Sequence, residues 1–438
     1  MSEGFAGWPG IPLSVQMTPP VAARPGRLAL LRSPALRSGA TFAAGGIGFA
    51  LGNVLLARVL PEIEYGRVAL FLALIQLGTV LGPVGVETLI NRHRLHAGRA
   101  LLARVGTTGM AAGLLLAAVT FAIYDLGAVL SALLALAIAS AALNRVAAAF
   151  FQSQRKFGSS LFLILVHNWI VLLAVPVVLL TGRRDALPAA LTIAAAYAAT
   201  ALRGWSRALR GPAEPERPAQ QAAPSGEAPP QPALLHEGLM VLGMQLALAA
   251  LYQLDRLIIP RALSIQDLAT YSVVSAVAAS PFRMLQTGLA FSLLPRLKAC
   301  AGGAEVRRLI RHEIGIACGA ALLACIGVLV FTDWVLRVAL EGRYELPRGL
   351  LAAFVIVGLV RVWSGISSAT ATAFGTARHL AMLNAFSWLA LLAAAASACA
   401  ARGFGLTGIV YGVGVGWLGL AIAGSFIGAR AVASRGAS

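Results

Sequence analysis

Leu246–Tyr271, LALAALYQLDRLIIPRALSIQDLATY, places an acid and a base inside an apolar segment that is long enough to cross a bilayer. The two residues are Asp255 and Arg256, near the outer end of the segment, with Tyr252 and Gln253 on one side and Leu257-Ile258-Ile259 on the other. A charge inside a membrane helix costs about 2.5–3.5 kcal/mol on insertion scales. This stretch therefore predicts a membrane helix whose polar groups have a partner or a function.

A weaker copy of the pattern occurs in the first half of the chain. Arg58 is followed by Val-Leu-Pro-Glu-Ile-Glu, and Arg261 is followed by Ala-Leu-Ser-Ile-Gln-Asp. Both copies have the order Arg, Leu, turn former and acid, and both close one apolar helix and open another. The repetition predicts two related halves, and function is expected where the halves meet.

The composition excludes a soluble domain. Of the 438 residues, 58% are apolar and only 12% are charged, whereas a soluble protein of this size needs a polar exterior. Long apolar runs that do not alternate with polar residues indicate an all-α polytopic membrane protein. The net charge of +18 then reflects Lys and Arg in cytoplasmic loops, and no nucleic-acid partner is expected.

The apolar runs predict about twelve transmembrane helices, near 37–60, 66–90, 105–124, 126–150, 159–181, 186–205, 237–262, 266–293, 308–331, 347–373, 379–401 and 405–428. A segment with seven prolines separates the first six spans from the last six and cannot form a span. The predicted organisation is a disordered cytoplasmic tail at 1–36, a six-helix bundle at 37–205, a Pro-rich cytoplasmic linker at 206–235 and a second six-helix bundle at 236–430.

The loops predict the orientation. Every second loop is basic, and the intervening loops carry mixed or acidic clusters such as Glu62/Glu64 and Glu341/Glu345. By the positive-inside rule both termini of the predicted multi-pass membrane protein are expected to be cytoplasmic. Since each half has an even number of spans, the repeat is expected to be parallel about an axis along the membrane normal.

Five arginines are candidates for substrate binding. Arg361 lies near the middle of its predicted span and Arg283 about two-thirds of the way along another, so neither guanidinium can easily reach the membrane surface. Each is expected to face a polar cavity or a partner. Arg58, Arg145 and Arg256 lie closer to span ends, where snorkelling to the surface explains them as well as a function does.

Two carboxylates are candidates for ion coupling. Asp255 either forms an internal salt bridge, with Arg283 or Arg361, or takes up and releases a proton during transport. Glu87, near the cytoplasmic end of its span, offers the same choice. Several arginines with one or two carboxylates suit an anionic substrate, because a guanidinium binds phosphate through paired donors and keeps its charge.

No enzyme motif, metal site or cofactor site is evident, so the chain is not expected to be an enzyme. The pair His167-Asn168 is isolated and is interpreted as a polar contact between helices. An ATP-binding motif is also absent from the sequence. Any transport is therefore expected to be driven by an ion gradient or by substrate gradients.

Two stretches resemble a known family. Gly46–Gly66, GIGFALGNVLLARVLPEIEYG, followed by the span end at Gly85, looks like the opening of bacterial polysaccharide-export flippases. Asp255-Arg256-Leu-Ile-Ile, Ala269-Thr-Tyr-Ser-Val-Val and Leu294-Pro-Arg look like the start of their second half. These flippases belong to the multidrug/oligosaccharidyl-lipid/polysaccharide superfamily, and the resemblance covers about residues 37–430. It implies a location in the bacterial cytoplasmic (inner) membrane.

The resemblance implies a MATE-like V-shaped pair of six-helix bundles around a cationic cavity that works by alternating access. It implies a substrate in the form of a polyprenyl-diphosphate-linked oligosaccharide, such as an O-antigen, capsule or exopolysaccharide repeat unit. Further implied partners are membrane lipids, a polysaccharide polymerase and glycosyltransferases. The cavity charges it carries over are Arg58, Arg145, Arg283, Arg361 and the pair Asp255-Arg256.

The alternative within the superfamily is a cation-coupled exporter of drugs or other small molecules. Such exporters typically hold an acidic residue in the first span, where this chain has Asn53 and no acid. Lipid II flippases usually carry two extra helices, which this chain lacks. A membrane-bound polysaccharide enzyme and an assembly scaffold without transport activity are the remaining alternatives.

Overall fold

The computed structural model describes residues 34–93, 98–154, 156–210, 231–299, 303–344, 346 and 348–435. Within these ranges the chain is helical and contains no strand, which confirms the predicted all-α class. The chain divides into two compact units, Met1–Thr41 and Phe42–Ser438. Apart from residues 34–36, the predicted tail at 1–36 lies outside the described residues, and the account below concerns the second unit.

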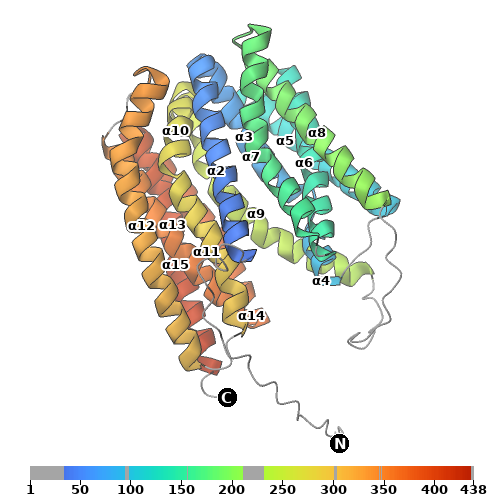
Figure 1. Cartoon of the computed structure of the whole chain (residues 1–438), viewed down its shortest axis with the longest axis vertical. Helices are drawn as coiled ribbons and strands as arrows, with labels where there is room; N and C mark the ends of the chain where they lie inside the picture. The colour runs from blue at the N-terminus through green and yellow to red at the C-terminus, as the bar shows by residue number, and fades with distance from the viewer. Residues whose placement is uncertain are drawn as a thin grey trace, which may run out of the picture. The chain divides into compact units, whose positions relative to one another are not determined.

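In the described part of the chain, seven α-helices precede residue 211 (Figure 1). Helix α6 contacts α3, α4, α5, α7 and α8 and is therefore the centre of this half. The bounds of the seven helices are α2 Pro34–Val59, α3 Glu62–Leu81, α4 Val86–His93, α5 Arg99–Tyr124, α6 Ala128–Ser153, α7 Phe157–Thr181 and α8 Leu187–Arg210.

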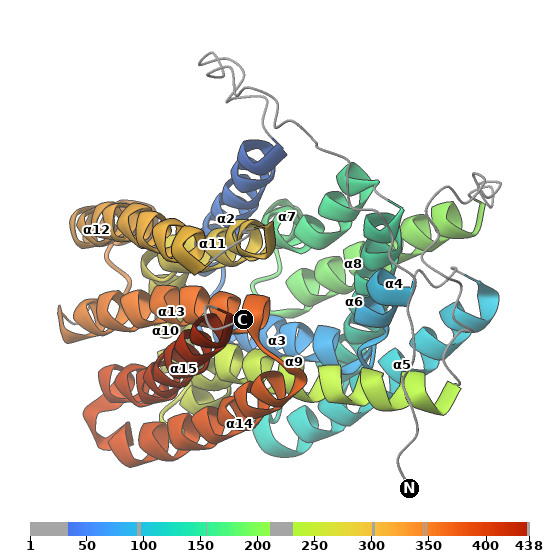
Figure 2. The ribbon, with the colours of Figure 1, turned by 90° about the horizontal axis from the view of Figure 1, so that it is seen from below.

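Seven further α-helices and one short 3-10 helix follow residue 230 in the described part. Helix α9 contacts α3 and α4 of the first half and α10, α14 and α15 of the second, so it joins the two. Seen from below, α3 and α9 lie between α5–α8 on one side and α12–α15 on the other (Figure 2). The bounds are α9 Gln231–Ala262, α10 Ile265–Ala278, α11 Ser280–Ala299, α12 Gly303–Leu340, α13 Arg348–Phe374, α14 Ala377–Ala400, η1 Ala401–Phe404 and α15 Gly405–Arg435.

These helices make the chain a multi-pass membrane protein. By length and composition, eight described helical segments can cross a membrane, or nine if the bent pair α10–α11 is one span. The stretch Arg378–Ala433 counts there as one segment although it contains both α14 and α15. Counting those two separately gives up to ten spans. Helix α2, of which Ala44–Val59 is a shorter apolar helix, and α8 are not among them, and including both is consistent with the prediction of about twelve.

Two predicted spans are broken, which the apolar pattern did not indicate. The span at 66–90 ends as α3 at Leu81 and resumes as α4 after a turn in which Val84 and Gly85 have φ of 52° and 75°. The span at 266–293 bends by 54° between α10 and α11. Apolar composition continues through both breaks, so hydropathy alone cannot locate them.

The margins of the predicted linker at 206–235 are helical. Helix α8 continues to Arg210 because Trp205 and Ala208 still pack in a buried cluster, and the Trp205 indole donates to the Leu143 carbonyl oxygen at 3.0 Å. Helix α9 already begins at Gln231. The rest of the predicted linker, 211–230, lies outside the described residues.

The repeated sequence pattern has a structural counterpart. In the second half, Ser264 is the N-cap of α10 and its hydroxyl accepts from the Asp267 amide at 3.0 Å. In the first half, Pro61 is the N-cap of α3, with Glu62 and Glu64 in the first turn. Acids in the first turn oppose the positive end of the helix dipole, so both copies end one helix and start the next.

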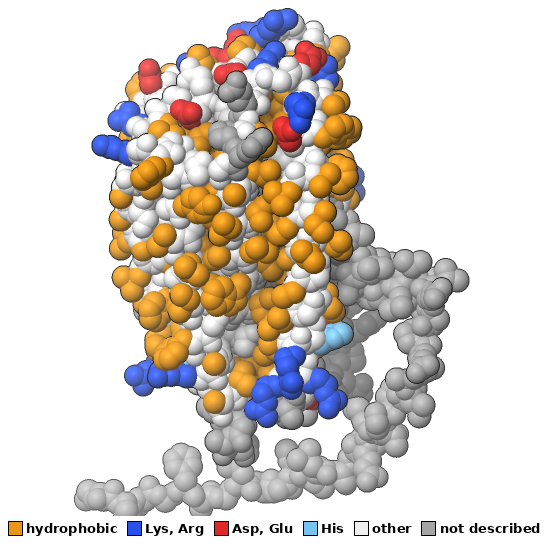
Figure 3. All heavy atoms as spheres, turned by 90° about the vertical axis from the view of Figure 1, so that its left-hand side faces the viewer, with side chains coloured by type: hydrophobic (Ala, Val, Ile, Leu, Met, Phe, Trp, Pro, Cys, Tyr) orange, Lys and Arg blue, Asp and Glu red, His pale blue; other side chains and the backbone are white. Residues whose placement is uncertain are grey.

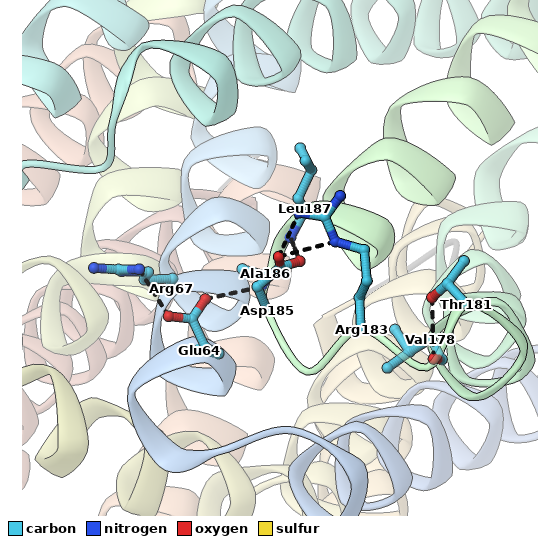
Figure 4. Close-up of polar contacts among 8 residues, drawn as sticks. All are labelled: Glu64, Arg67, Val178, Thr181, Arg183, Asp185, Ala186 and Leu187. Atoms are coloured by element: carbon cyan, nitrogen blue, oxygen red, sulfur yellow. Dashed lines mark hydrogen bonds and ion pairs between the residues drawn. The ribbon is translucent and has the colours of Figure 1, made fainter.

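The α7–α8 loop is fixed to the first turn of α3 (Figure 4). The Glu64 carboxylate accepts from the Ala186 amide at 2.8 Å and pairs with Arg67 at 2.7 Å. Asp185 accepts from the Leu187 amide at 3.2 Å and pairs with Arg183 at 2.6 Å. These contacts position the start of α8.

The outer face of α12 is apolar along most of its length. Figure 3 shows hydrophobic side chains over the middle of this face, Lys and Arg at its lower end, and charges of both signs at its upper end. The exposed basic residues at the start of α12 are Arg307, Arg308 and Arg311. An apolar belt between two charged ends is the surface expected of a protein in a bilayer.

Candidate functional site

A cavity of about 380 Å³ lies between helices of the two halves. Its walls come from α2, α3, α6 and α7 of the first half and from α9 and α11 of the second. Three of the five candidate arginines line it. The lining residues are Gly46, Phe49, Gln76, Thr79, Val80, Arg145, Ile164, Leu165, His167, Asn168, Ala249, Tyr252, Gln253, Arg256, Ser280, Arg283, Met284 and Thr287.

Arg256 is buried in α9 and is held by neutral partners. Its guanidinium donates to Gln253 Oε1 at 3.2 Å and to Ser275 Oγ at 3.4 Å. Only 6% of the residue is exposed. These bonds orient the guanidinium, but both partners are neutral and do not compensate its positive charge.

Arg283 lies in the first turn of α11, immediately after the bend that separates α10 from α11. The bend brings both Ser280 and Arg283 to the cavity wall. Nε of Arg283 is buried and has no hydrogen-bond partner among the described residues. The start of a broken membrane helix adds the positive end of its dipole to this charge, an arrangement that favours an anion.

Arg145 of α6 contacts α4 and α9 at the cavity wall. Its Nη2 donates to Gln245 Oε1 of α9 at 2.6 Å, and Gln245 Nε2 donates to Thr88 Oγ1 of α4 at 3.2 Å. Its Nε lies 3.1 Å from Glu87 Oε1, close enough for an ion pair. The geometry between Arg145 Nε and Glu87 Oε1 does not meet the requirements of a hydrogen bond, however. Both carboxylate oxygens of Glu87 are buried and have no hydrogen-bond partner among the described residues.

Asp255 and Arg361 form a buried cluster behind the cavity wall. Arg361 Nη2 lies 3.6 Å from Asp255 Oδ2, with side-chain exposures of 8% and 4%. The same carboxylate accepts from the Tyr271 hydroxyl, and its other oxygen accepts from the Arg256 amide at 2.9 Å. The structure thus contains the internal salt bridge that was one of the two interpretations of Asp255.

The Arg361 guanidinium also lies against two aromatic rings. It is 5.9 Å from the centroid of Tyr252 and 5.1 Å from that of Trp417. Since Tyr252 lines the cavity and Arg361 does not, the ring separates this guanidinium from the cavity. A change at Asp255 or Arg361 can therefore reach the cavity through Tyr252 and the adjacent Arg256.

The structure does not bring Arg58 to the cavity. Arg58, at the end of α2, pairs with Glu341 at 2.6 Å, and their side chains are 50% and 72% exposed. Arg343 donates to the Arg58 and Leu60 carbonyl oxygens at 3.3 and 3.4 Å. These contacts join the two halves at the end of the protein opposite the basic end of α12.

The sequence interpretation missed several polar cavity residues. His167 and Asn168 were interpreted as a contact between helices, but both line the cavity. His167 Nδ1 lies 2.6 Å from the Ile164 carbonyl oxygen, which can only accept, so Nδ1 carries the proton and Nε2 is left as an acceptor. Gln76, Thr79 and Gln253 were not singled out either, because uncharged polar residues are common inside membrane helices.

Positive charge exceeds negative charge at this site. Four guanidinium groups lie on or directly behind the wall, and two carboxylates, Glu87 and Asp255, pair with them. Among the described residues no carboxylate lines the cavity itself. Like charges repel strongly where water is scarce, so the arrangement is complementary to an anion that carries about two charges.

Comparisons with known proteins identify the fold. No family model matches the chain, and no curated protein matches it. A multidrug resistance MATE family transporter of the MOP superfamily, in an inward-facing conformation, superposes with a TM-score of 0.62 at 14% identity over 91% of this chain and 99% of that one. The lipid II flippase MurJ, in an inward closed conformation, gives 0.59 at 11% identity over 92% and 88%. MATE in complex with MaL6 gives 0.55 at 16% identity over 93% and 99%.

Proposed function

We propose that this chain is a flippase that moves a polyprenyl-diphosphate-linked oligosaccharide across the cytoplasmic membrane by alternating access. The observation that carries the proposal is the convergence of Arg145, Arg256 and Arg283 on one cavity between the two halves. A diphosphate that joins a lipid to a sugar has roughly one negative charge per phosphoryl group, as phosphodiesters do. Such a group matches the excess positive charge of the site. The likeness in fold to transporters and to a lipid flippase is consistent with this function.

In this proposal the residues have distinct roles. Arg256 and Arg283 bind the diphosphate, and Arg145 binds it after releasing Glu87. Neutral acceptors such as His167 Nε2 and Gln76 bind sugar hydroxyl groups, which the guanidinium groups cannot accept from. Because a guanidinium keeps its charge at all physiological pH values, the binding site does not depend on its own protonation.

Alternating access requires contacts that differ between two states. The contacts of Arg58 with Glu341 and of Arg343 with the end of α2 join the two halves at one end in this structure, and we propose that they break in the other state. We assign the other end, which carries the exposed basic residues, to the cytoplasm by the positive-inside rule. We assign ion coupling to Asp255, because its protonation would remove the charge partner of Arg361 behind the cavity wall.

Transport by purified protein in proteoliposomes tests the proposal. The substrate is a fluorescent polyprenyl-diphosphate disaccharide, and the variants are Arg283→Gln, Arg283→Lys and, as a matched control, the exposed Arg308→Gln. A charge-assisted hydrogen bond is worth about 1.5–3 kcal/mol, so Arg283→Gln should slow transport at limiting substrate roughly 10- to 100-fold. Arg283→Lys should retain part of the rate, and Arg308→Gln should match the unchanged protein.

Two results would contradict the proposal. One is equal transport of the diphosphate-linked disaccharide by Arg283→Gln and by the unchanged protein. The other is transport of a cationic drug, unaffected by Arg283→Gln, in vesicles that do not move the disaccharide. The second result would favour the alternative function, cation-coupled export of small molecules.

A further inference from the structure

A second, larger cavity lies on the outside of the second half. It is a groove of about 760 Å³ between α12 and the pair α13–α15, within the range of about 300–1,000 Å³ that is usual for ligand sites. Its lining includes Ile314 and Cys318 of α12, Val362 and Trp363 of α13, and Val432 of α15, and Arg307 lies at its basic end. We propose that this groove binds one anionic phospholipid, with an acyl chain along α13 and the phosphate on Arg307.

The groove exists because α12 packs loosely while α13 and α15 pack tightly. Only 17% of the apolar stretch of α12 is buried, compared with 50% for α13. On the other side, a Cβ at Gly424 would lie 2.8 Å from Ser367 Oγ, so α13 and α15 are already in close contact. Hydrocarbon must therefore fill the space under α12 in a membrane, since an empty apolar groove loses its dispersion contacts.

The interior of the groove suits a hydrocarbon chain. Its three side-chain hydroxyl groups are already engaged. Ser367 and Thr370 donate to backbone carbonyl oxygens of α13 at 3.1 and 2.9 Å, and Ser425 accepts from the Trp363 indole at 3.1 Å. Apart from the Ser425 O–H, no hydroxyl donor of the groove floor is left among the described residues to select a polar ligand, so a chain of CH2 groups would be favoured along it.

The basic end of the groove selects an anion. Arg307 is exposed there, and within the described residues no carboxylate pairs with it. Arg308 follows it directly and Arg311 lies one helix turn further on, and both are exposed. A Lys or Arg near the membrane surface attracts anionic lipid, so the phosphate of a phospholipid is the expected contact.

The groove is separate from the arginine cavity, which favours a phospholipid over the lipid tail of the transported substrate. Helices α11 and α13 lie between the two spaces and pack through glycines. A Cβ at Gly358 would lie 2.5 Å from Phe282, and one at Gly365 would lie 2.9 Å from Gln286. A substrate with its diphosphate in the cavity could not place its tail in the groove unless these helices parted.

Fluorescence quenching by lipids with brominated acyl chains tests the proposal, because Trp363 lines the groove. The contribution of Trp363 is obtained as the difference in quenching between the unchanged protein and Trp363→Phe. In full-length purified protein, brominated phosphatidylglycerol should quench it at lower concentration than brominated phosphatidylcholine. Arg307→Gln should weaken the phosphatidylglycerol effect about fivefold, the equivalent of ~1 kcal/mol, and clearly more than Arg308→Gln does, because only Arg307 of the two lines the groove.

A second pair of variants blocks the groove without changing charge. Ala429→Trp, at an exposed lining position of α15, should abolish the phosphatidylglycerol preference, whereas Ile422→Trp, exposed on α15 outside the groove, should not. Equal quenching by the two lipids in every variant would show contact with bulk lipid only and overturn the proposal. Displacement of the brominated lipid by a polyprenyl phosphate, but not by unlabelled phosphatidylglycerol, would assign the groove to the substrate tail and also overturn it.

Discussion

Separating Asp255 from Arg361 should destabilise the protein strongly. The two side chains are almost fully buried and 3.6 Å apart. At an effective dielectric constant of about 20, two unit charges at this distance attract by about 4–5 kcal/mol. Removing one partner of a buried pair leaves an uncompensated charge and usually costs about 3–5 kcal/mol.

Other residues around Asp255 and Arg361 stabilise whichever charge remains, so the loss of stability should lie in the lower part of the range of about 3–5 kcal/mol. In Arg361→Gln the remaining carboxylate still accepts from the Tyr271 hydroxyl and the Arg256 amide. In Asp255→Asn the remaining guanidinium still lies against the rings of Tyr252 and Trp417. We therefore expect each single change to lower the free energy of unfolding by about 3 kcal/mol, and the double change to cost little more than either.

The assay is equilibrium unfolding in mild detergent, followed by circular dichroism, for both single variants and the double variant. Arg183→Gln is the control, because Arg183 and Asp185 form an exposed pair and its loss should cost less than about 1 kcal/mol. The reasoning would be refuted by single changes that cost no more than the control. Strictly additive costs in the double variant would refute it equally, since they would show that the two charges do not interact.

Three further outcomes follow from the structure. Glu87→Gln removes the carboxylate beside Arg145 and should raise the affinity for inorganic diphosphate about fivefold by calorimetry; unchanged or weaker affinity would contradict this. Arg58→Gln breaks an exposed ion pair outside the cavity, so it should leave diphosphate affinity unchanged and alter stability by less than about 1 kcal/mol; a loss of affinity would place Arg58 in the binding site. Gly412→Leu should lower the thermal unfolding midpoint by several degrees, because even a Cβ there would lie 2.4 Å from the Ala398 backbone, whereas the exposed Gly419→Leu should not.

The helical class was predictable because it depends on composition, which needs no knowledge of packing. The helix ends near Arg58 and Arg261 were predictable for a local reason as well. A turn former followed by an acid caps a helix through contacts within a few residues, as Ser264 and Asp267 do. The breaks after Leu81 and Ala278 were missed because hydropathy continues through them, although Gly82-Pro83 and Ser280-Pro281 are local signals for the end or bend of a helix.

The sequence predicted how deep in the membrane each candidate residue lies, but not toward which neighbour its side chain points. Sequence indicates how far along a helix an arginine lies, and three of the five candidates do line the cavity. Which face of the helix an arginine occupies depends on tertiary packing, which turns Arg361 toward Asp255 and leaves Arg58 at the exposed end of α2. His167 shows the same limit, because a polar side chain inside a membrane helix can face either a neighbouring helix or a cavity.

The central claim is that the arginine cavity binds a diphosphate. The most direct measurement compares the affinity of the purified protein for a short-chain polyprenyl-diphosphate sugar with its affinity for the same lipid and sugar joined by a neutral linkage. We expect the diphosphate compound to bind at least about 100-fold more tightly, with a preference that falls as salt is raised and is lost in Arg283→Gln. Equal affinity for the two compounds, or a preference that survives Arg283→Gln, would contradict the claim.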